Sequence, residues 1–139
     1  MIDLSIVILN WNVCDLLDRC LASLRSDRYA LEIIVVDNAS RDDSVTMVRA
    51  KYPQVTVIAN AENRGFAGAV NQGVRALSEP FVAILNPDVE ALTPLEPLAE
   101  ACADVRTAGA CGRLVGEDGE TQSGFFVRRL PTPGTLICE

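Results

Sequence analysis

Residues 81–89 read FVAILNPDV, an apolar run that stops abruptly at Asn86, Pro87 and Asp88. An uninterrupted apolar run of this kind between two prolines is typical of a central strand covered on both faces of a sheet. The second proline ends the strand, which places Asp88 at its carboxyl end. Open α/β sheets bind their ligands at that edge. The stretch therefore predicts a buried strand followed by a candidate binding residue.

The residues 86–88 also have a simpler explanation. Asparagine, proline and aspartate are all common in turns, so this segment alone favours an ordinary turn. The rest of the chain favours a functional interpretation, because polar residues follow the other predicted strands in the same way.

Three more apolar runs predict strands, at residues 4–9, 33–36 and 55–58. Helical spacing of apolar residues follows each of them, and we expect Asn12 and Ser40 to cap the first two helices. Small residues on the third helical stripe, Ala69 and Gly73, predict close packing against the sheet. Alternating strands and helices predict an α/β fold, with a mostly parallel sheet and helices on both faces.

Beyond the fourth strand the pattern is shorter. Thr93 followed by Pro94 and Glu96 predicts a helix start, with the threonine as its cap. The run 110–115 predicts a fifth strand, and Asp118-Gly119 predicts a hairpin turn that leads into 121–127. The chain carries no recognisable closing element.

Composition excludes several classes of protein. The 139 residues carry a formal charge of -7, which disfavours binding to nucleic acid or to anionic lipid. Five cysteines without any histidine or C-x-x-C pair disfavour a zinc site and indicate a reducing compartment. No apolar run approaches the length of a membrane-spanning helix, so we expect a cytoplasmic protein that attaches at most peripherally to the inner face of the membrane.

Polar clusters follow the predicted strands at residues 10–12, 37–40 and 86–88, and the loop 60–65 joins them. Parallel strands with helical crossovers all point the same way, so these clusters should meet at one edge of the sheet. Asp37 can accept hydrogen bonds from a base or a ribose, and Asp88 can ligate Mg²⁺ or Mn²⁺ that is bound to phosphates. Arg64 and the amides after Gly65 can donate to phosphate. Neither a G-x-G-x-x-G nor a P-loop motif occurs, which disfavours dinucleotide oxidoreductases and P-loop enzymes.

Four segments together resemble a known family: SIVILNWN, IIVVDNASRDDS, NAENRGFAGAVNQG and FVAILNPDV. They look like family-two inverting glycosyltransferases of the A-type fold, in particular the branch that includes bacterial rhamnosyltransferases. The likeness spans roughly residues 4–127 and is specific, because four motifs occur in the same order. It implies a Rossmann-like nucleotide-diphospho-sugar transferase fold and a role in polysaccharide biosynthesis.

The resemblance also implies which residues bind the substrate. These are Asn10, Asn12, Asp37, Asn38, Arg64, Gly65, Asn71 and Asn86. Asp37 would bind the base, and Asp88 would be the direct ligand of Mg²⁺ or Mn²⁺. Asn86 stands where many relatives have the first aspartate of an Asp-x-Asp motif, which leaves the metal with one carboxylate.

The implied reaction moves a sugar, with inversion, from a dTDP- or UDP-linked donor to a hydroxyl of a glycan or lipid-linked acceptor. The family's general base lies well downstream of the Asp-x-Asp motif, and nothing here matches it; Asp118 and Glu120 read as a solvated turn. The catalytic residues are therefore unknown, and we expect residues 1–139 to be one nucleotide-sugar-binding domain that lacks its acceptor-binding half.

Two other functions fit parts of the sequence. The first is a non-catalytic module that binds a nucleotide sugar, which the expected lack of an acceptor-binding half favours. The second is a phosphoacceptor signalling domain in which Asp37 would be modified. That domain needs acidic residues after its first strand, where this chain has Asn10, Trp11 and Asn12.

Overall fold

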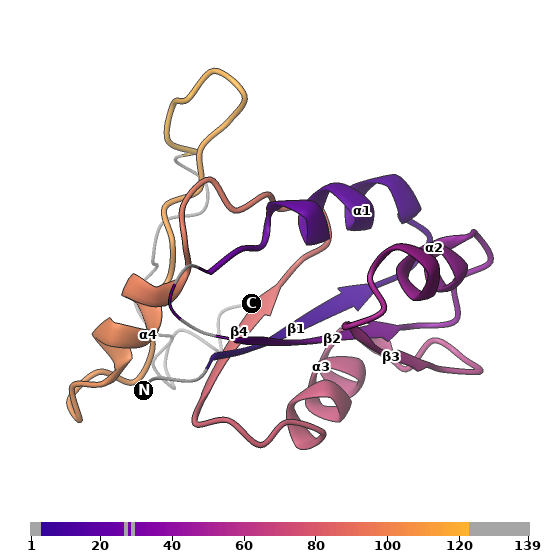
Figure 1. Cartoon of the computed structure of the whole chain (residues 1–139), viewed down its shortest axis with the longest axis horizontal. Coiled ribbons are helices and arrows are strands. Elements are labelled where there is room, and N and C mark those ends of the chain that lie inside the picture. Colours follow the sequence, from indigo (N-terminus) through magenta and orange to yellow (C-terminus); the bar gives the residue numbers. More distant parts are fainter. Residues whose placement is uncertain (1–3, 27, 29, 123–139) are drawn as a thin grey trace, which may run out of the picture.

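The computed structural model describes residues 4–26, 28 and 30–122, in which four parallel strands form one sheet (Figure 1). Their order is β3-β2-β1-β4, with β1 at Leu4–Asn10, β2 at Leu31–Asp37, β3 at Thr56–Ala59 and β4 at Phe81–Leu85. The helices are α1 at Cys14–Ser23, α2 at Ser44–Lys51, α3 at Gly65–Arg75 and α4 at Glu96–Cys102. Each β-α-β connection therefore returns the chain to the same end of the sheet, as in other parallel α/β folds.

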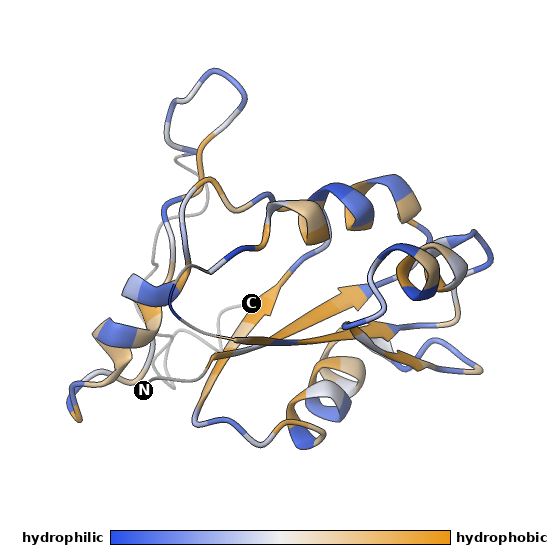
Figure 2. Cartoon of the chain, viewed as in Figure 1, coloured by the Kyte–Doolittle hydropathy of each residue, from blue (hydrophilic) through white to orange (hydrophobic). Residues whose placement is uncertain are grey.

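Helices cover both faces of this sheet, which confirms the predicted α/β class. Ile6 and Ile8 of β1 pack in one cluster with buried residues of α1 and α2. Val7, which points to the opposite face, packs with Ala69 of α3. Figure 2 shows the apolar strands between helices whose outward sides are hydrophilic. No helix within the described residues is long and apolar enough to span a membrane.

The inner strands are β2 and β1, and the prediction that residues 81–89 form a buried central strand is wrong. In the described part of the chain, β4 pairs only with β1 and lies at the edge of the sheet. It ends at Leu85, and the side chain of Ile84 is 51% exposed. An apolar run shows that a strand prefers burial, but it does not show how many neighbours the strand has.

The predicted helix caps are also wrong, because the helix starts are held by contacts between loops. Asn12 has a left-handed backbone (φ 56°) and precedes the N-cap residue of α1, and Ser40 lies well before α2. Asp42 serves both helices instead, since its carboxylate accepts from the backbone N–H of Cys14 at 3.0 Å and of Ser44 at 3.1 Å. Burial desolvates this carboxylate, yet these hydrogen bonds hold the pKa of Asp42 below its ordinary value.

Two predictions for the later part of the chain need correction. The last helix, α4, begins at Glu96 and not at Thr93, with Leu95 as its N-cap. The predicted fifth strand at 110–115 is absent, and a single antiparallel bridge joins Val115 to Thr121. The predicted turn at Asp118-Gly119 is confirmed: the N–H of Gly119, which has a positive φ of 77°, donates to the carbonyl of Gly116. Most of 121–127 lies outside the described residues.

The close packing predicted for the third helix is confirmed at Gly73. A Cβ atom added to this glycine would lie 2.6 Å from Cγ1 of Val7 and 3.1 Å from Cγ2 of Val36. Both valines are fully buried and their branched side chains have few rotamers to move into. The glycine therefore sets the distance between α3 and the sheet.

We predict that Gly73→Ala destabilises the protein by up to about 2 kcal/mol, since the overpacking cost of about 1–3 kcal/mol outweighs the gain in helix propensity of about 1 kcal/mol. Gly68→Ala is the matched control on the same helix. Its added Cβ would meet only Cβ of Arg64, at 3.5 Å, so we expect equal or higher stability. Urea unfolding of both variants is the measurement, and a Gly73→Ala protein as stable as the parent would contradict the tight packing.

Candidate functional site

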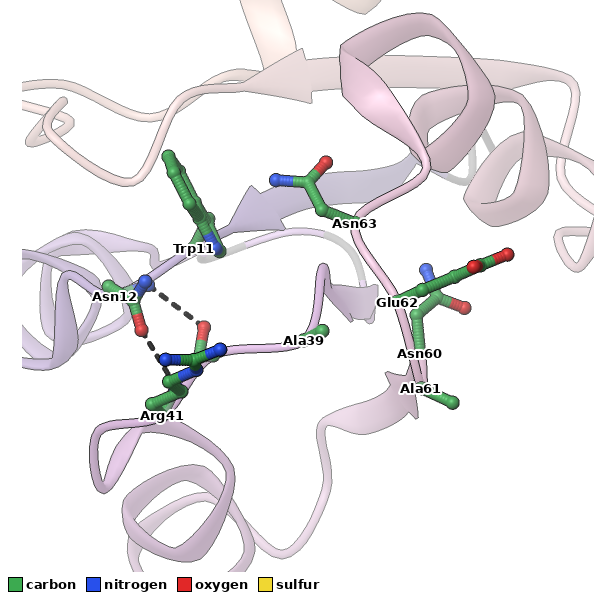
Figure 3. Close-up of a pocket in the computed structure, with 9 residues that line it drawn as sticks. Trp11, Asn12, Ala39, Arg41, Asn60, Ala61, Glu62 and Asn63 are labelled. Carbon is green, nitrogen blue, oxygen red and sulfur yellow. Dashed lines mark hydrogen bonds between the residues drawn. The ribbon is translucent and has the colours of Figure 1, made fainter.

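A pocket of about 690 Å³ opens at the carboxyl ends of β1, β2 and β3. Its walls come from the three loops that follow these strands, as Figure 3 shows. The lining residues are Trp11, Asn12, Ala39, Ser40, Arg41, Asn60, Ala61, Glu62 and Asn63. The predicted convergence of polar clusters at one edge of the sheet is thus confirmed for the first two strands and for the loop 60–63.

A buried hydrogen bond joins the neighbouring ends of β1 and β2 next to this pocket, between two residues that do not themselves line it. Asn10 and Asp37 are partners in the β1–β2 register, and they are 0% and 2% exposed. The amide nitrogen Nδ2 of Asn10 donates to Oδ1 of Asp37 at 2.8 Å. The other carboxylate oxygen, Oδ2, accepts the backbone N–H of Ser40 at 2.9 Å. Both predicted residues are therefore at the site, but each is held by the protein itself.

A second set of hydrogen bonds ties the loop after β1 to the loop after β2. Oγ of Ser40 accepts from Nδ2 of Asn10 at 3.1 Å and from the backbone N–H of Asn12 at 2.9 Å. In return, Oδ1 of Asn12 accepts the backbone N–H of Arg41 at 2.7 Å. Asn12 and Ala39 both have positive φ angles, of 56° and 65°, a conformation that costs energy for residues other than glycine. These cross-loop bonds hold the strained wall in place.

The third wall is organised by Asn38, a buried residue at the end of β2. Its Oδ1 accepts the backbone N–H of Arg64 at 2.9 Å, and this backbone donor fixes which end of the amide is the oxygen. Nδ2 of Asn38 consequently donates to Oδ1 of Asn63 at 2.7 Å, and the same oxygen accepts the backbone N–H of Gly65 at 2.9 Å. The orientation of both amides is thus determined by backbone groups that cannot be reversed.

This orientation leaves Nδ2 of Asn63 as a donor on the pocket wall, without a protein partner in the part of the chain that the structure describes. Figure 3 shows the Asn63 amide and the Trp11 indole on opposite sides of the pocket, with the amide nitrogen turned toward the indole. Trp11 is 56% exposed, so it does not belong to the packed core. The pocket offers an aromatic face and a fixed donor to a planar polar group.

Asp88 lies outside the lining of this pocket, in the turn after β4. Because β4 is parallel to β1, this turn lies at the same edge of the sheet. The carboxylate is exposed and makes no hydrogen bond or ion pair with any described residue. Asn86 is exposed as well, and its backbone carbonyl accepts the N–H of Val89 at 3.3 Å.

These residues fit a divalent cation only if the substrate supplies ligands too. Within residues 4–26, 28 and 30–122, no group of three or more His, Cys, Asp or Glu side chains could hold a metal. A single free carboxylate is nevertheless the usual protein contribution to Mg²⁺ sites in which phosphate oxygens and waters complete the coordination. Asp88 therefore fits a cation shared with a diphosphate, and no dedicated metal cage is present among the described residues.

The other predicted residues lie around the start of α3. Arg64 and Gly65 form the turn into the helix, where Gly65 has a φ of 72°, and the side chain of Arg64 is exposed. Asn71 is exposed on α3 itself. None of these three residues lines the pocket. They would contact only a ligand that extends beyond it.

The sequence analysis did not identify Asn63 or Arg41 as site residues. Asn63 lies in the segment NAENRGFAGAVNQG, but the turn that fixes its amide is visible only in the structure. Glu62 also lines the pocket, although its carboxylate points away from Trp11 (Figure 3). Asp118 and Glu120 lie in the turn at 116–120, where the aspartate accepts the N–H of the glutamate at 2.9 Å, as expected for a structural turn.

Comparison with known proteins finds relatives that match most of this chain. The chain is 29% identical over 120 residues to the succinoglycan biosynthesis protein ExoU of Rhizobium meliloti, a match that covers 84% of this chain and 31% of the relative. It is 28% identical to the N-acetylglucosaminyl-diphospho-decaprenol L-rhamnosyltransferase of Mycobacterium tuberculosis, over 84% of this chain and 42% of that enzyme. The chain thus spans less than half of the length of these relatives.

Solved structures share the fold. A mannosyltransferase from Pyrobaculum calidifontis, in complex with GDP-mannose and Mn²⁺, superposes with a TM-score of 0.64 and 25% identity over 76% of this chain and 32% of the enzyme. Staphylococcus aureus TarS with UDP-GlcNAc has a TM-score of 0.61 and 21% identity over 75% of this chain and 31% of that one, which indicates a common fold. The Glycosyl transferase family 2 profile matches residues 5–136. The chain therefore belongs to glycosyl transferase family 2.

Proposed function

We propose that this chain is the nucleotide-sugar-binding part of an inverting glycosyltransferase that uses a dTDP- or UDP-linked sugar. The acceptor would be a hydroxyl of a glycan or of a lipid-linked saccharide, as in the rhamnosyltransferase-like branch of the family. The observation that carries the proposal is the pocket between Trp11 and Asn63, which adjoins the buried Asn10–Asp37 pair and shares its sheet edge with Asp88.

The polar groups at the pocket are complementary to uracil and thymine. Both bases have an N–H flanked by two carbonyl groups, so they need one acceptor and at least one donor. The Asp37 carboxylate has lone pairs left after its two protein hydrogen bonds, and Nδ2 of Asn63 is a fixed donor. Trp11 offers its ring as a stacking surface for the base.

The diphosphate would then lie toward β4, next to β1 at the same edge. Asp88 would hold Mg²⁺ or Mn²⁺ there together with the phosphates, and Arg64 at the start of α3 would donate to them. The cation supplies charge neutralisation on the leaving diphosphate when it is bound. Asn12, Asn38, Gly65, Asn71 and Asn86 would complete the binding surface.

The acceptor's proton must be taken by a general base, which typically contributes about 10²–10⁴-fold to the rate. The pocket lining contains one carboxylate, Glu62, and it faces away from Trp11. We therefore place the base in an acceptor-binding half outside these residues. The alternative of a non-catalytic nucleotide-sugar-binding module makes the same binding predictions, and transfer activity of a longer chain distinguishes the two. The cytoplasmic location stays a prediction.

We predict that Asp88→Ala abolishes the enhancement of UDP and dTDP binding by Mn²⁺ and leaves the fold intact. The side chain is exposed and without partners among the described residues, so its removal costs no protein contact. Isothermal titration with and without Mn²⁺ measures the effect, with uridine as a ligand that needs no cation. Equal Mn²⁺ enhancement in variant and parent would refute the metal assignment.

We predict that Asn63→Asp weakens the binding of uridine and UDP at least about 10-fold. An aspartate keeps an oxygen for the N–H groups of Asn38 and Gly65, but it presents an acceptor instead of a donor to the pocket. The loss of one hydrogen bond and the unfavourable contact between two acceptors correspond to about 1.5–3 kcal/mol.

Ala61→Asp is the charge-matched control for Asn63→Asp. It adds the same charge to the wall of the same pocket without changing the donor. Uridine carries no phosphate, so its affinity should fall in Asn63→Asp and stay within about twofold of the parent in Ala61→Asp. Equal losses in the two variants would show that charge alone, and not the Asn63 donor, determines affinity.

A further inference from the structure

The turn that carries Asp88 is attached to helix α1 at three points. The thiol of Cys20 donates to the backbone carbonyl of Asn86 at 3.8 Å, and Oγ of Ser23 accepts the backbone N–H of Ala91 at 2.8 Å. Arg19 of the same helix forms an ion pair with Glu90, which lies between Asn86 and Ala91 in the sequence. These contacts lie on both sides of Asp88 in the sequence, so they restrict the turn from its start to its end.

We propose that Arg19 and Ser23 are positioning residues that fix the Asp88 carboxylate for its divalent cation. The inference rests on the proposed function, which assigns the cation to Asp88. Neither residue lines the pocket, and neither belongs to a motif that carries the family resemblance.

The sheet alone holds this turn weakly. In the described part of the chain β4 is an edge strand with one hydrogen-bonded neighbour, and it ends at Leu85, before the turn. A metal ligand has to be placed within about 0.2 Å, and sites on loops are less precise than sites on helices or strands. Contacts from a helix that is packed against the sheet supply the missing restraint.

Ser23 is well suited to this role, because both functions of its hydroxyl are used. The O–H group donates to the carbonyl of Cys20 at 2.7 Å, which fixes the rotamer, and the oxygen then accepts the N–H of Ala91. Cys20 acts in the same direction. Its side chain is fully buried, which holds the thiol where it donates to the carbonyl of Asn86.

The same helix also borders the nucleoside pocket. Asn12 lies just before α1 and lines the pocket, and the first N–H of the helix, at Cys14, donates to Asp42 in the loop after β2. One rigid helix thus connects the wall of the base pocket to the cation turn. The packed residues Leu17, Cys20 and Leu21 hold it against the sheet. In this way α1 links the position of the pocket wall to that of the Asp88 turn.

The test measures the Mn²⁺ concentration that gives half of the enhancement of UDP binding. We expect Ser23→Ala and Arg19→Ala each to raise this concentration about 10-fold, the usual effect of removing a residue that orients a metal ligand. Uridine affinity should stay within about twofold of the parent. The Arg19–Glu90 pair is exposed, so its loss should change the melting temperature very little.

Two further variants distinguish positioning from a general loss of structure. Ser23→Thr keeps the hydroxyl, and the double variant Arg19→Glu with Glu90→Arg reverses the ion pair; both should recover the parent's Mn²⁺ dependence. Lys51→Met, at the end of α2, is the control for the loss of an ion pair to α1. It breaks the ion pair with Asp18 of α1, while Tyr52 still donates to Asp18 at 2.6 Å, and it should leave the Mn²⁺ dependence unchanged.

Asp88→Ala, measured in parallel, separates this inference from the proposed function. If Asp88→Ala removes the Mn²⁺ enhancement while Ser23→Ala and Arg19→Ala behave as the parent does, the positioning role is wrong and the metal assignment stands. Should Asp88→Ala itself keep the enhancement, the metal assignment fails first, and the positioning role fails with it. Equal effects of Lys51→Met and Arg19→Ala would overturn the specific role of the Asp88 turn.

Discussion

The site depends on one buried hydrogen bond, between Nδ2 of Asn10 and Oδ1 of Asp37. It joins the last residues of the two inner strands, where the sheet ends and the loops begin. A buried carboxylate is costly unless its oxygens are bonded, so these two side chains are stable only together. From this pair, Ser40 extends the connection to Asn12 and so determines the shape of one pocket wall.

The sequence predicted the layers of this fold well, because buried strands such as residues 4–9 consist mostly of apolar residues. It was wrong about β4, since the run 81–85 is apolar although the strand has one neighbour among the described residues. It was also wrong about Asn12, Ser40 and Thr93 as helix caps. Local capping rules consider a few adjacent residues, whereas here Asp42 reaches the start of α1 from 28 positions away.

The candidate site was predictable to the level of the sheet edge and no further. Strand ends place Asn10 and Asp37 together in any parallel α/β sheet, and the structure confirms that placement. The donor role of Asn63 follows from two backbone N–H groups, at Arg64 and Gly65, whose directions depend on the turn into α3. Such directions are not encoded in spacing, so a residue in a recognised motif could still be missed.

The site divides into two parts with different rigidity. Around the base pocket, side-chain amides and one buried carboxylate bond to each other and to the backbone, so the walls are set before a ligand arrives. Asp88 has no such network among the described residues and depends on contacts from α1. Under the proposed function, a preformed nucleoside pocket would avoid an ordering cost on binding. The exposed carboxylate of Asp88 would then be available to a cation that is bound to the diphosphate.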